Sequence, residues 1–231
     1  MPHLTRTAFL GLAATMMIAG PSLGAEGIET PNYEVLASET TGAVPYETIE
    51  LRRYGPMIVA EVTVMASNRD EASSKGFRPL ADYIFGRNAP GGTISMTAPV
   101  TTTPATSGEG EKIAMTAPVT TAATESDDGR YTVRFMMPSK YTMETLPEPL
   151  DPEVRLSRIP ARILVALRFV GERSPERVAA AEKAILTYRE ETGLEPSGPF
   201  VTAGYDGPDT PISEKRWEVQ RPVVSVDPVT P

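Results

Sequence analysis

The feature that most constrains the fold of this chain is an internal repetition. Residues 154–170 align without a gap on residues 49–65 when the numbering is shifted by 105. The shift places Leu156 on Leu51, Arg158 on Arg53, Ile163 on Ile58 and Leu167 on Val62. Each segment reads as two strands, because apolar residues alternate with polar or variable ones; Gly55-Pro56 joins the strands of the first segment. The chain therefore has to fold as two similar halves.

A helix is predicted after each strand pair. In the first half, Asn68 with Glu71 three residues later has the form of a capping box, and the helix is expected to end at Gly86. Pro79 predicts a kink or a restart within it. In the second half, Ser174 and Pro175 are typical of a helix start and Gly193 of a helix end. The apolar faces are Phe77, Leu80, Ala81 and Ile84 in the first helix, and Val178, Ala181, Ile185 and Tyr188 in the second.

Further strands complete the two halves. Alternating patterns predict strands at 130–138, 198–206 and 215–223, and the proline-rich stretch 146–152 reads as a connection. The fold class that follows is α+β, a pseudo-two-fold duplicated ββαββ-type domain. A length of 231 residues, 40% of them hydrophobic, suits one such domain. We place it at residues 46–222, after a polar segment at 26–45 and before a disordered tail at 223–231.

Residues 1–25 have the order of a secretory signal peptide. Arg6 precedes thirteen apolar residues, and small residues follow around Pro21. An uncleaved anchor is the alternative, although the apolar run is short for a membrane span. With no Cys in the chain, a lipid-modified N-terminus and disulfides are excluded. We expect a bacterial protein, periplasmic or secreted, with no membrane span after signal cleavage.

The scarcity of reactive side chains limits the chemistry. The chain has one His, His3, which lies in the segment expected to be removed. The remainder offers no usual zinc ligand, no His or Cys base or nucleophile, and no Ser-His-Asp arrangement. We expect no enzyme activity and no metal cofactor. A formal net charge of −8 without a Lys/Arg-rich run argues against a nucleic-acid partner. Apolar small molecules or proteins are the expected partners.

A nine-residue phrase occurs twice in the middle of the chain. "ISMTAPVTT" at 94–102 returns as "IAMTAPVTT" at 113–121, and a Gly/Ser/Glu-containing linker separates the copies. Together with "YETIELRRYGPMIVAEV", "GFRPLADYIFGRN", "RFMMPSKY", "PEPLDPEV" and "GYDGPDTPISEKRWEV", the doubled phrase resembles the SOUL haem-binding protein family. The resemblance covers roughly residues 33–222. It implies a distorted antiparallel sheet or barrel of about eight strands flanked by two helices.

The resemblance also implies a function and a site. The implied function is non-enzymatic binding of haem or a related tetrapyrrole in a shallow apolar groove beside the first helix. The expected groove residues are Phe77, Leu80, Ala81 and Ile84, with Arg78 or Arg87 for a propionate and Met96 and Met115 entering the same space. Each Met-Thr-Ala-Pro-Val copy would be a strand closed by its proline, and the two would face each other across a hairpin. The methionines could equally be core filler, and the arginines solvated.

Alternatives remain open at this stage. Without an axial His, the iron would need Met, Tyr, water or no protein ligand, so metal-free porphyrin should bind almost as well as haem. The same fold could instead be an effector-binding module for amphipathic molecules, which an acidic groove residue would favour. It could also be a structural envelope protein, which a groove filled by its own side chains would favour. Replacing Leu80 by Asp is expected to abolish binding in the predicted groove.

Overall fold

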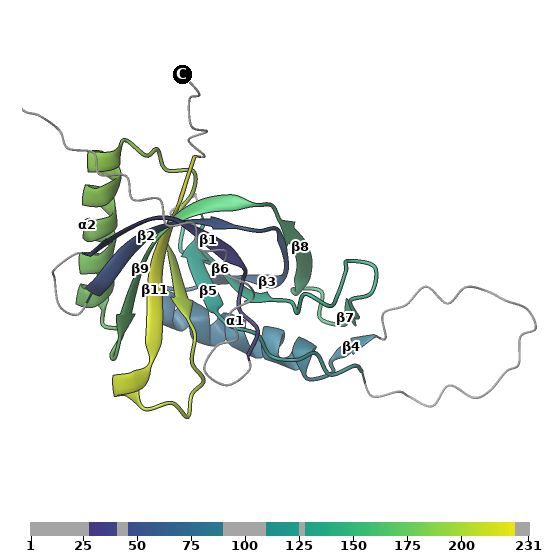
Figure 1. Ribbon diagram of the computed structural model, residues 1–231. Coiled ribbons are helices and arrows are strands. Elements are labelled where there is room, and N and C mark those ends of the chain that lie inside the picture. Colours follow the sequence, from purple (N-terminus) through teal and green to yellow (C-terminus); the bar gives the residue numbers. More distant parts are fainter. Residues whose placement is uncertain (1–27, 41–45, 90–109, 125–127, 225–231) are drawn as a thin grey trace, which may run out of the picture.

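The computed structural model of the protein describes residues 28–40, 46–89, 110–124 and 128–224. The predicted signal peptide, the first copy of the doubled phrase and nearly all of the predicted tail lie outside these residues. Figure 1 shows a curled sheet flanked by two helices. The elements are β1 Tyr33–Thr40, β2 Tyr46–Tyr54, β3 Met57–Met65, α1 Arg69–Ile84, β4 Asn88–Ala89, β5 Val119–Ala123, β6 Arg130–Met136, β7 Glu148–Pro149, β8 Arg155–Ile159, β9 Arg162–Val170, α2 Pro175–Thr192, β10 Val201–Gly204, a 3₁₀ turn Ile212–Glu214 and β11 Arg216–Val223.

The main sheet is antiparallel, and its order shows how the two halves interlock. Nine strands are arranged as β1-β2-β9-β11-β10-β5-β6-β3-β8, and β4 pairs separately with β7. The consecutive strands β2 and β3 are not neighbours, and neither are β8 and β9. Instead β2 pairs with β9 of the second half, and β8 of the second half pairs with β3. Each half therefore supplies one strand to the other.

The residue pairing of these exchanged strands agrees with the internal repetition. Leu51 pairs with Val165, and a shift of 105 turns this pair into Leu156 with Ala60, which are also partners. Apart from the edge strand β1, the sheet consists of two groups of four strands, β2-β9-β11-β10 and β5-β6-β3-β8. The two groups meet where β5 pairs with β10, at Thr121 and Thr202. The duplicated α+β domain predicted from the sequence is confirmed, and its pseudo-two-fold relation extends to individual residue pairs.

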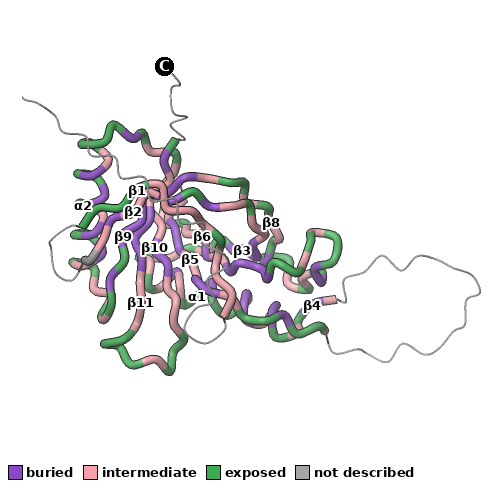
Figure 2. Tube along the Cα trace, in the orientation of Figure 1, coloured by how far each residue is buried: buried purple, intermediate pink, exposed green. Residues whose placement is uncertain are grey.

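Both helices pack on the same face of the sheet, one on each half. α2 lies on β9 and β11, where Val165, Leu167 and Val219 are fully buried against Ala181 and Ile185. α1 lies on β3 and β6 and forms the second core, in which Ala60, Val62, Val133, Leu80 and Tyr83 are buried. Figure 2 shows that buried residues concentrate where helices and strands meet. Neither helix among the described residues has the length and apolar character needed to cross a membrane.

The opposite face of the sheet carries no helix, and we call it the helix-free face. Successive side chains of a strand point to opposite faces. The residues that alternate with the core residues, such as Val59, Arg134, Leu164 and Gln220, therefore belong to the helix-free face. They come from both halves of the sheet, yet they line one common cavity. The helix-free face thus curves around this space.

The helix signals in the sequence are largely confirmed. The Asn68 side chain accepts hydrogen bonds from the backbone N–H of Asp70 and of Glu71, at 3.0 and 2.9 Å. The Glu71 carboxylate, however, accepts from Ser67, so the reciprocal half of the capping box is shifted by one residue. Pro79 does not interrupt α1. Ser174 caps α2, and Gly193 ends it with a φ of 70°.

The sheet begins earlier than predicted. β1 lies within residues 26–45, the segment expected to precede the domain, and it pairs along most of its length with β2. Its burial falls from half-buried at Tyr33 to exposed at Thr40. An edge strand with such a small buried surface lacks a clear alternating apolar pattern, which explains why its sequence reads as polar.

The second copy of the doubled phrase does not form the predicted strand. Ile113 is buried in the α1 core, Met115 is 46% exposed, and regular pairing begins only at Val119, after Pro118. The described backbone just before Pro118 makes individual hydrogen bonds and no regular strand pairing. The Ile113 N–H donates to the carbonyl of Ile84, and the Ala117 N–H donates to the carbonyl of Glu29. Proline therefore precedes the strand, where its missing N–H is tolerated, and does not close it. The expected hairpin with residues 94–102 lies outside the described residues.

Candidate functional site

The groove predicted beside α1 is occupied by the protein itself. Leu80, Ala81 and Ile84 are 0, 8 and 2% exposed, and Leu80 and Ile84 pack on the sheet. Phe77 is 39% exposed and lies edge-on to Phe135 at a ring distance of 5.3 Å. The apolar face of α1 thus contacts its own sheet, the commonest use of such a face.

The other residues predicted for that groove are scattered. Arg78 and Arg87 are exposed, and Arg87 pairs with Asp82 at 3.1 Å. Met115 is 46% exposed and does not belong to the core that α1 forms with the sheet. Met96 lies outside the described residues. The structure therefore brings Leu80, Ala81 and Ile84 together as core, and leaves Phe77 and the two arginines on the surface.

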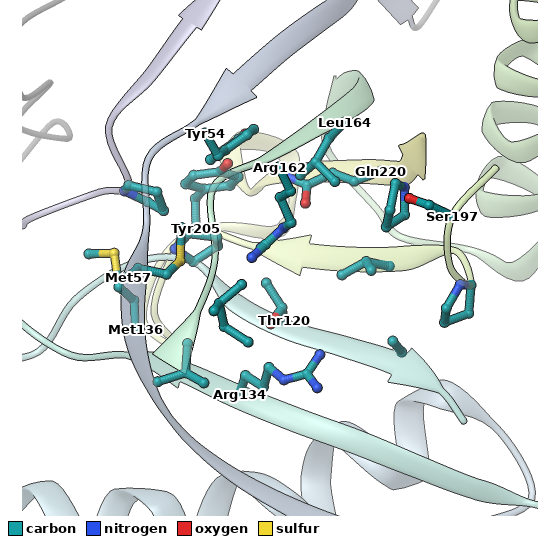
Figure 3. Close-up of a pocket in the computed structure, with 18 residues that line it drawn as sticks. Tyr54, Met57, Thr120, Arg134, Met136, Arg162, Leu164, Ser197, Tyr205 and Gln220 are labelled. Carbon is teal, nitrogen blue, oxygen red and sulfur yellow. The ribbon is translucent and has the colours of Figure 1, made fainter. Parts of the chain in front are cut away.

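A cavity of about 340 Å³ lies on the helix-free face. Figure 3 shows side chains from strands on different sides of it pointing inward. Its wall is mainly apolar, and that part is formed by Pro31, Met57, Val59, Pro118, Ala122, Met136, Ile159, Leu164, Pro199, Val201 and Pro222. The polar part consists of Tyr54, Thr120, Arg134, Arg162, Ser197, Tyr205 and Gln220. An apolar wall with a few polar groups is the usual character of a small-molecule site.

A second cavity, of about 680 Å³, adjoins the first. Pro31, Met57, Met136 and Ile159 line both. It lies beside the Gly55-Pro56 turn and the Pro138–Thr142 segment, with Tyr141 and Arg158 in its wall. The two spaces therefore adjoin at these four shared residues. No residue of α1 lines either cavity.

A buried ionic network lies behind one wall of the first cavity. Glu218 on β11 is fully buried, and both of its carboxylate oxygens accept a hydrogen bond from Arg52 Nη1 at 3.0 Å. Arg168 Nη2 donates to the same carboxylate at 2.8 Å. Tyr205 Oη and Gln220 Nε2 each donate to it at 2.8 Å. Tyr205 and Gln220 also line the cavity, so the network fixes the position of that wall.

The network keeps Glu218 ionised. Burial alone raises the pKa of its carboxyl group, but the charges of Arg52 and Arg168 and the hydrogen bonds from Gln220 and Tyr205 outweigh burial, and the pKa lies below its ordinary value. Burial raises the pKa of Tyr205 and of Tyr54, and the negative charge of Glu218 raises both further. The two tyrosines therefore face the cavity as neutral phenols.

Two arginines contribute the charge of the first cavity. Among its described lining residues, Arg134 and Arg162 are charged and none is Asp or Glu. Arg134 Nε donates to Glu61 at 2.7 Å. Arg162 is different, because its Nη1 atom is buried and has no hydrogen-bond partner among the described residues. Burial, followed by repulsion from Arg134, lowers the pKa of Arg162 below its ordinary value.

Few groups at this site could bind iron. Among the described residues, no cluster of three or more His, Cys, Asp or Glu side chains is arranged to hold a metal ion. Binding iron through tyrosine requires the phenolate, which the raised pKa values of Tyr54 and Tyr205 disfavour. The thioethers of Met57 and Met136 are the other iron ligands available in the wall. The part of the wall that the structure describes therefore offers only weak ligands for iron.

Sequence reasoning did not identify this site, although some signal was present. Arg134 and Arg162 occupy alternate positions of strands whose other face is covered by a helix, and such positions read as ordinary solvent-facing charges. Glu218 and Gln220 alternate with Trp217 and Val219 in the same way. Only the curvature of the sheet turns these polar positions toward an enclosed space.

The chain is similar to known proteins over most of its length. A family model described as SOUL heme-binding protein matches residues 28–109 and again residues 105–222. The first match contains β1 to β4 with α1, and the second spans β5 to nearly the end of β11 and includes α2. The human protein named Heme-binding protein 2 is 26% identical over 209 residues, which cover 88% of this chain and 91% of the human one.

Two solved structures share the fold at low sequence identity. The crystal structure of the EcmrR C-terminal domain aligns with a TM-score of 0.56 at 14% identity, over 79% of this chain and all of that one. A protein from Listeria innocua that is called a hydrolase aligns with a TM-score of 0.51 at 15% identity, over 76% of this chain and 91% of that one. At such identities these structures establish the fold and not the chemistry.

Proposed function

Because this chain belongs to the SOUL heme-binding protein family, we propose that it binds haem or a related tetrapyrrole on the helix-free face of its sheet. The observation that carries the proposal is the first cavity together with the second, which adjoins it at Met57 and Met136. The relative named Heme-binding protein 2 adds support, since it covers nearly the whole chain. The ligand would lie in this space and not beside α1, where Leu80, Ala81 and Ile84 fill the predicted groove.

Binding by burial of the ring faces fits the wall of the cavity. Apolar surface removed from water contributes roughly 25 cal/mol per Å², so a flat apolar ring needs no bond to its metal to bind well. The Met57 and Met136 side chains are soft and adapt to irregular surfaces. We therefore expect a non-enzymatic carrier or scavenger that accepts tetrapyrroles with and without iron. A periplasmic location, supported by the signal-peptide pattern of residues 1–25, is part of this proposal.

The effector-binding alternative receives less support from the charges. That alternative was expected to show an acidic residue in the groove, with a preference for cationic ligands. The first cavity is lined by two arginines, and Glu218 lies behind Tyr205 and Gln220 with its charge already paired. The acidic residue Glu29 lines only the second cavity, together with Arg158. The first cavity also argues against a purely structural role, because no side chain of the residues that the structure describes fills it.

The test is a titration of the purified protein, from residue 28 onward, with haemin and in parallel with metal-free protoporphyrin IX. The Soret band and the emission of Trp217, the one tryptophan, report binding. We expect saturation at one ligand per protein for both compounds, with affinities within about tenfold of each other. Binding of haemin alone would contradict recognition by ring faces. No saturable binding of either compound would overturn the proposed function.

A further inference from the structure

One guanidinium nitrogen of Arg162 lacks a hydrogen-bond partner among the described residues. This atom, Nη1, is buried in the wall of the first cavity. A buried donor that finds neither water nor protein is costly, and native structures contain few of them. The cost is higher for a charged group, since its burial without a counter-charge is opposed by desolvation.

The surroundings of Arg162 increase this cost. Arg162 pairs in register with Tyr54, whose hydroxyl already accepts a hydrogen bond from Arg52 at 3.1 Å. The charged group that acts on Arg162 from across the cavity is Arg134, which is a like charge. Figure 3 shows both guanidinium groups extending into the space from opposite sides. Glu61 pairs with Arg134, and no described carboxylate lines the cavity near Arg162.

The other buried guanidinium atoms without hydrogen bonds do not share this situation. Arg189 Nε and Arg221 Nε also lack partners among the described residues. The Arg189 side chain, however, pairs with Glu195 at 3.8 Å, and Arg221 lies over the ring of Phe200 at 4.5 Å. Neither lines a cavity described above. Arg162 is thus distinguished by combining an unsatisfied charged donor with a position in the wall of a cavity.

We propose that Arg162, assisted by Arg134, receives the anionic group of an apolar ligand, so that the first cavity selects anionic over cationic or neutral molecules. A carboxylate is the natural complement, because a guanidinium donates to it through two parallel N–H groups. The remaining wall is apolar and accommodates the rest of the molecule. If the proposed function holds, the anionic group is a tetrapyrrole propionate, and that application rests on the proposed function.

The charge preference can be tested without a tetrapyrrole. Tetraphenylborate and tetraphenylphosphonium have the same shape and opposite charges, and calorimetry measures the affinity of each. We expect tetraphenylborate to bind at least about tenfold more tightly than the cation, and Arg162→Met to remove that preference. Arg155→Met is the matched control, because Arg155 is exposed on β8 and lines neither cavity. Equal affinities in the unaltered protein, an unchanged preference in R162M, or failure of both probes to bind would each overturn the inference.

A second comparison separates this inference from the proposed function. Protoporphyrin IX and its dimethyl ester differ only in their carboxylates. We expect R162M to weaken binding of the free acid about tenfold and to leave binding of the ester unchanged. An equal loss for both would assign Arg162 a structural role and overturn the inference while leaving tetrapyrrole binding in place. Selective binding of tetraphenylborate without any porphyrin binding would overturn the proposed function and leave the inference standing.

The stability of R162M provides the last check. An arginine kept for a ligand contributes no stabilising contact in the free protein, so its replacement by an apolar side chain of similar length should not lower the midpoint of urea unfolding. A marked fall in the midpoint for R162M, with no fall for R155M, would show that Arg162 supports the fold and would count against the ligand role.

Discussion

At the scale of single residues, Glu218 combines complete burial with ion pairs to two arginines, Arg52 and Arg168. Two arginines, a tyrosine and a glutamine satisfy its carboxylate. Removing one member of such a buried arrangement leaves the others with uncompensated charge and is strongly destabilising. The intact arrangement, in contrast, contributes little net stability, because its attraction is offset by the cost of desolvation. Its contribution is therefore best measured by its dependence on pH.

We predict that Glu218→Gln lowers the free energy of unfolding by about 3 kcal/mol at pH 7. The pKa of Glu218 in the folded protein lies below the ordinary value of 4.5, so the unfolded chain takes up the proton first as the pH falls. The stabilisation is then fully present above that ordinary value and is lost as the pH falls through the lowered pKa. Urea unfolding at pH 7, 5, 4 and 3 should show the difference between the two proteins shrinking in acid. A difference that stays constant over this range would mean that Glu218 is not the ionised centre of the network.

At the scale of elements, the contact between α1 and β6 depends on the absence of a side chain at Gly76. A Cβ atom at this position would lie 2.5 Å from Val133 Cγ2 and 2.6 Å from Val133 Cβ, and Val133 is fully buried. The helix can approach the sheet this closely only because residue 76 is glycine. This contact sets the distance between α1 and the strand that carries Arg134 on its other face.

We predict that Gly76→Ala destabilises the protein by about 1–3 kcal/mol, even though alanine favours a helix more than glycine does. Truncating the neighbour in the double variant G76A/V133A should recover part of the loss, so that the double variant is more stable than the sum of the two single changes implies. Urea unfolding gives the four stabilities. Gly207→Ala is the control, since a Cβ atom added there would meet nothing within 4 Å and its φ is ordinary. Additive losses would mean that the two positions do not contact each other.

The elements also show which parts of the structure the sequence predicts. Caps such as Ser174 and apolar spacings such as Val178 to Tyr188 depend on neighbouring residues, and they located α2 to within one residue. β1 escaped prediction because an edge strand buries too little to show a pattern. The prediction of a ligand groove beside α1 was wrong because apolar residues such as Leu80 and Ile84 have the same spacing whether they face a ligand or a sheet. The cavity residues come from strands far apart in the chain, and no local pattern joins Arg134 to Arg162.

At the scale of the whole molecule, the two halves create the site together. β2, β9 and β11 supply one side of the first cavity, and β3, β5 and β6 supply the other. The helices lie on the opposite face and stabilise the curvature without contributing to the wall. A ligand of the protein should therefore respond to changes on the helix-free face and ignore changes on the exposed surface of α1.

We predict that Thr120→Phe, which places a ring in the first cavity from β5, weakens protoporphyrin IX binding at least about tenfold. Phe77→Ala should leave the affinity within about twofold, because Phe77 is on the surface of α1 and lines neither cavity. Both affinities come from the same fluorescence titration, with circular dichroism to verify folding. Leu80→Asp is unsuitable for this purpose, since it would place a charge in the core. The reverse result, a loss of affinity in F77A alone, would contradict a site on the helix-free face and support one beside α1.

The exchange of β2 and β8 between the halves also has an evolutionary meaning. A half-length ancestor would have needed the exchanged strand of a second copy to complete its part of the sheet. The present chain therefore corresponds to a fused homodimer. In a symmetric dimer, both sides of the central space carry the same residue. After fusion the copies are free to diverge, and the shift of 105 shows the result: Arg162 faces the cavity on one side, and its counterpart on the other side is Met57. The duplicated positions of the cavity wall thus differ, with Arg162 on one side where Met57 stands on the other, and an asymmetric wall can hold an asymmetric molecule in a single orientation.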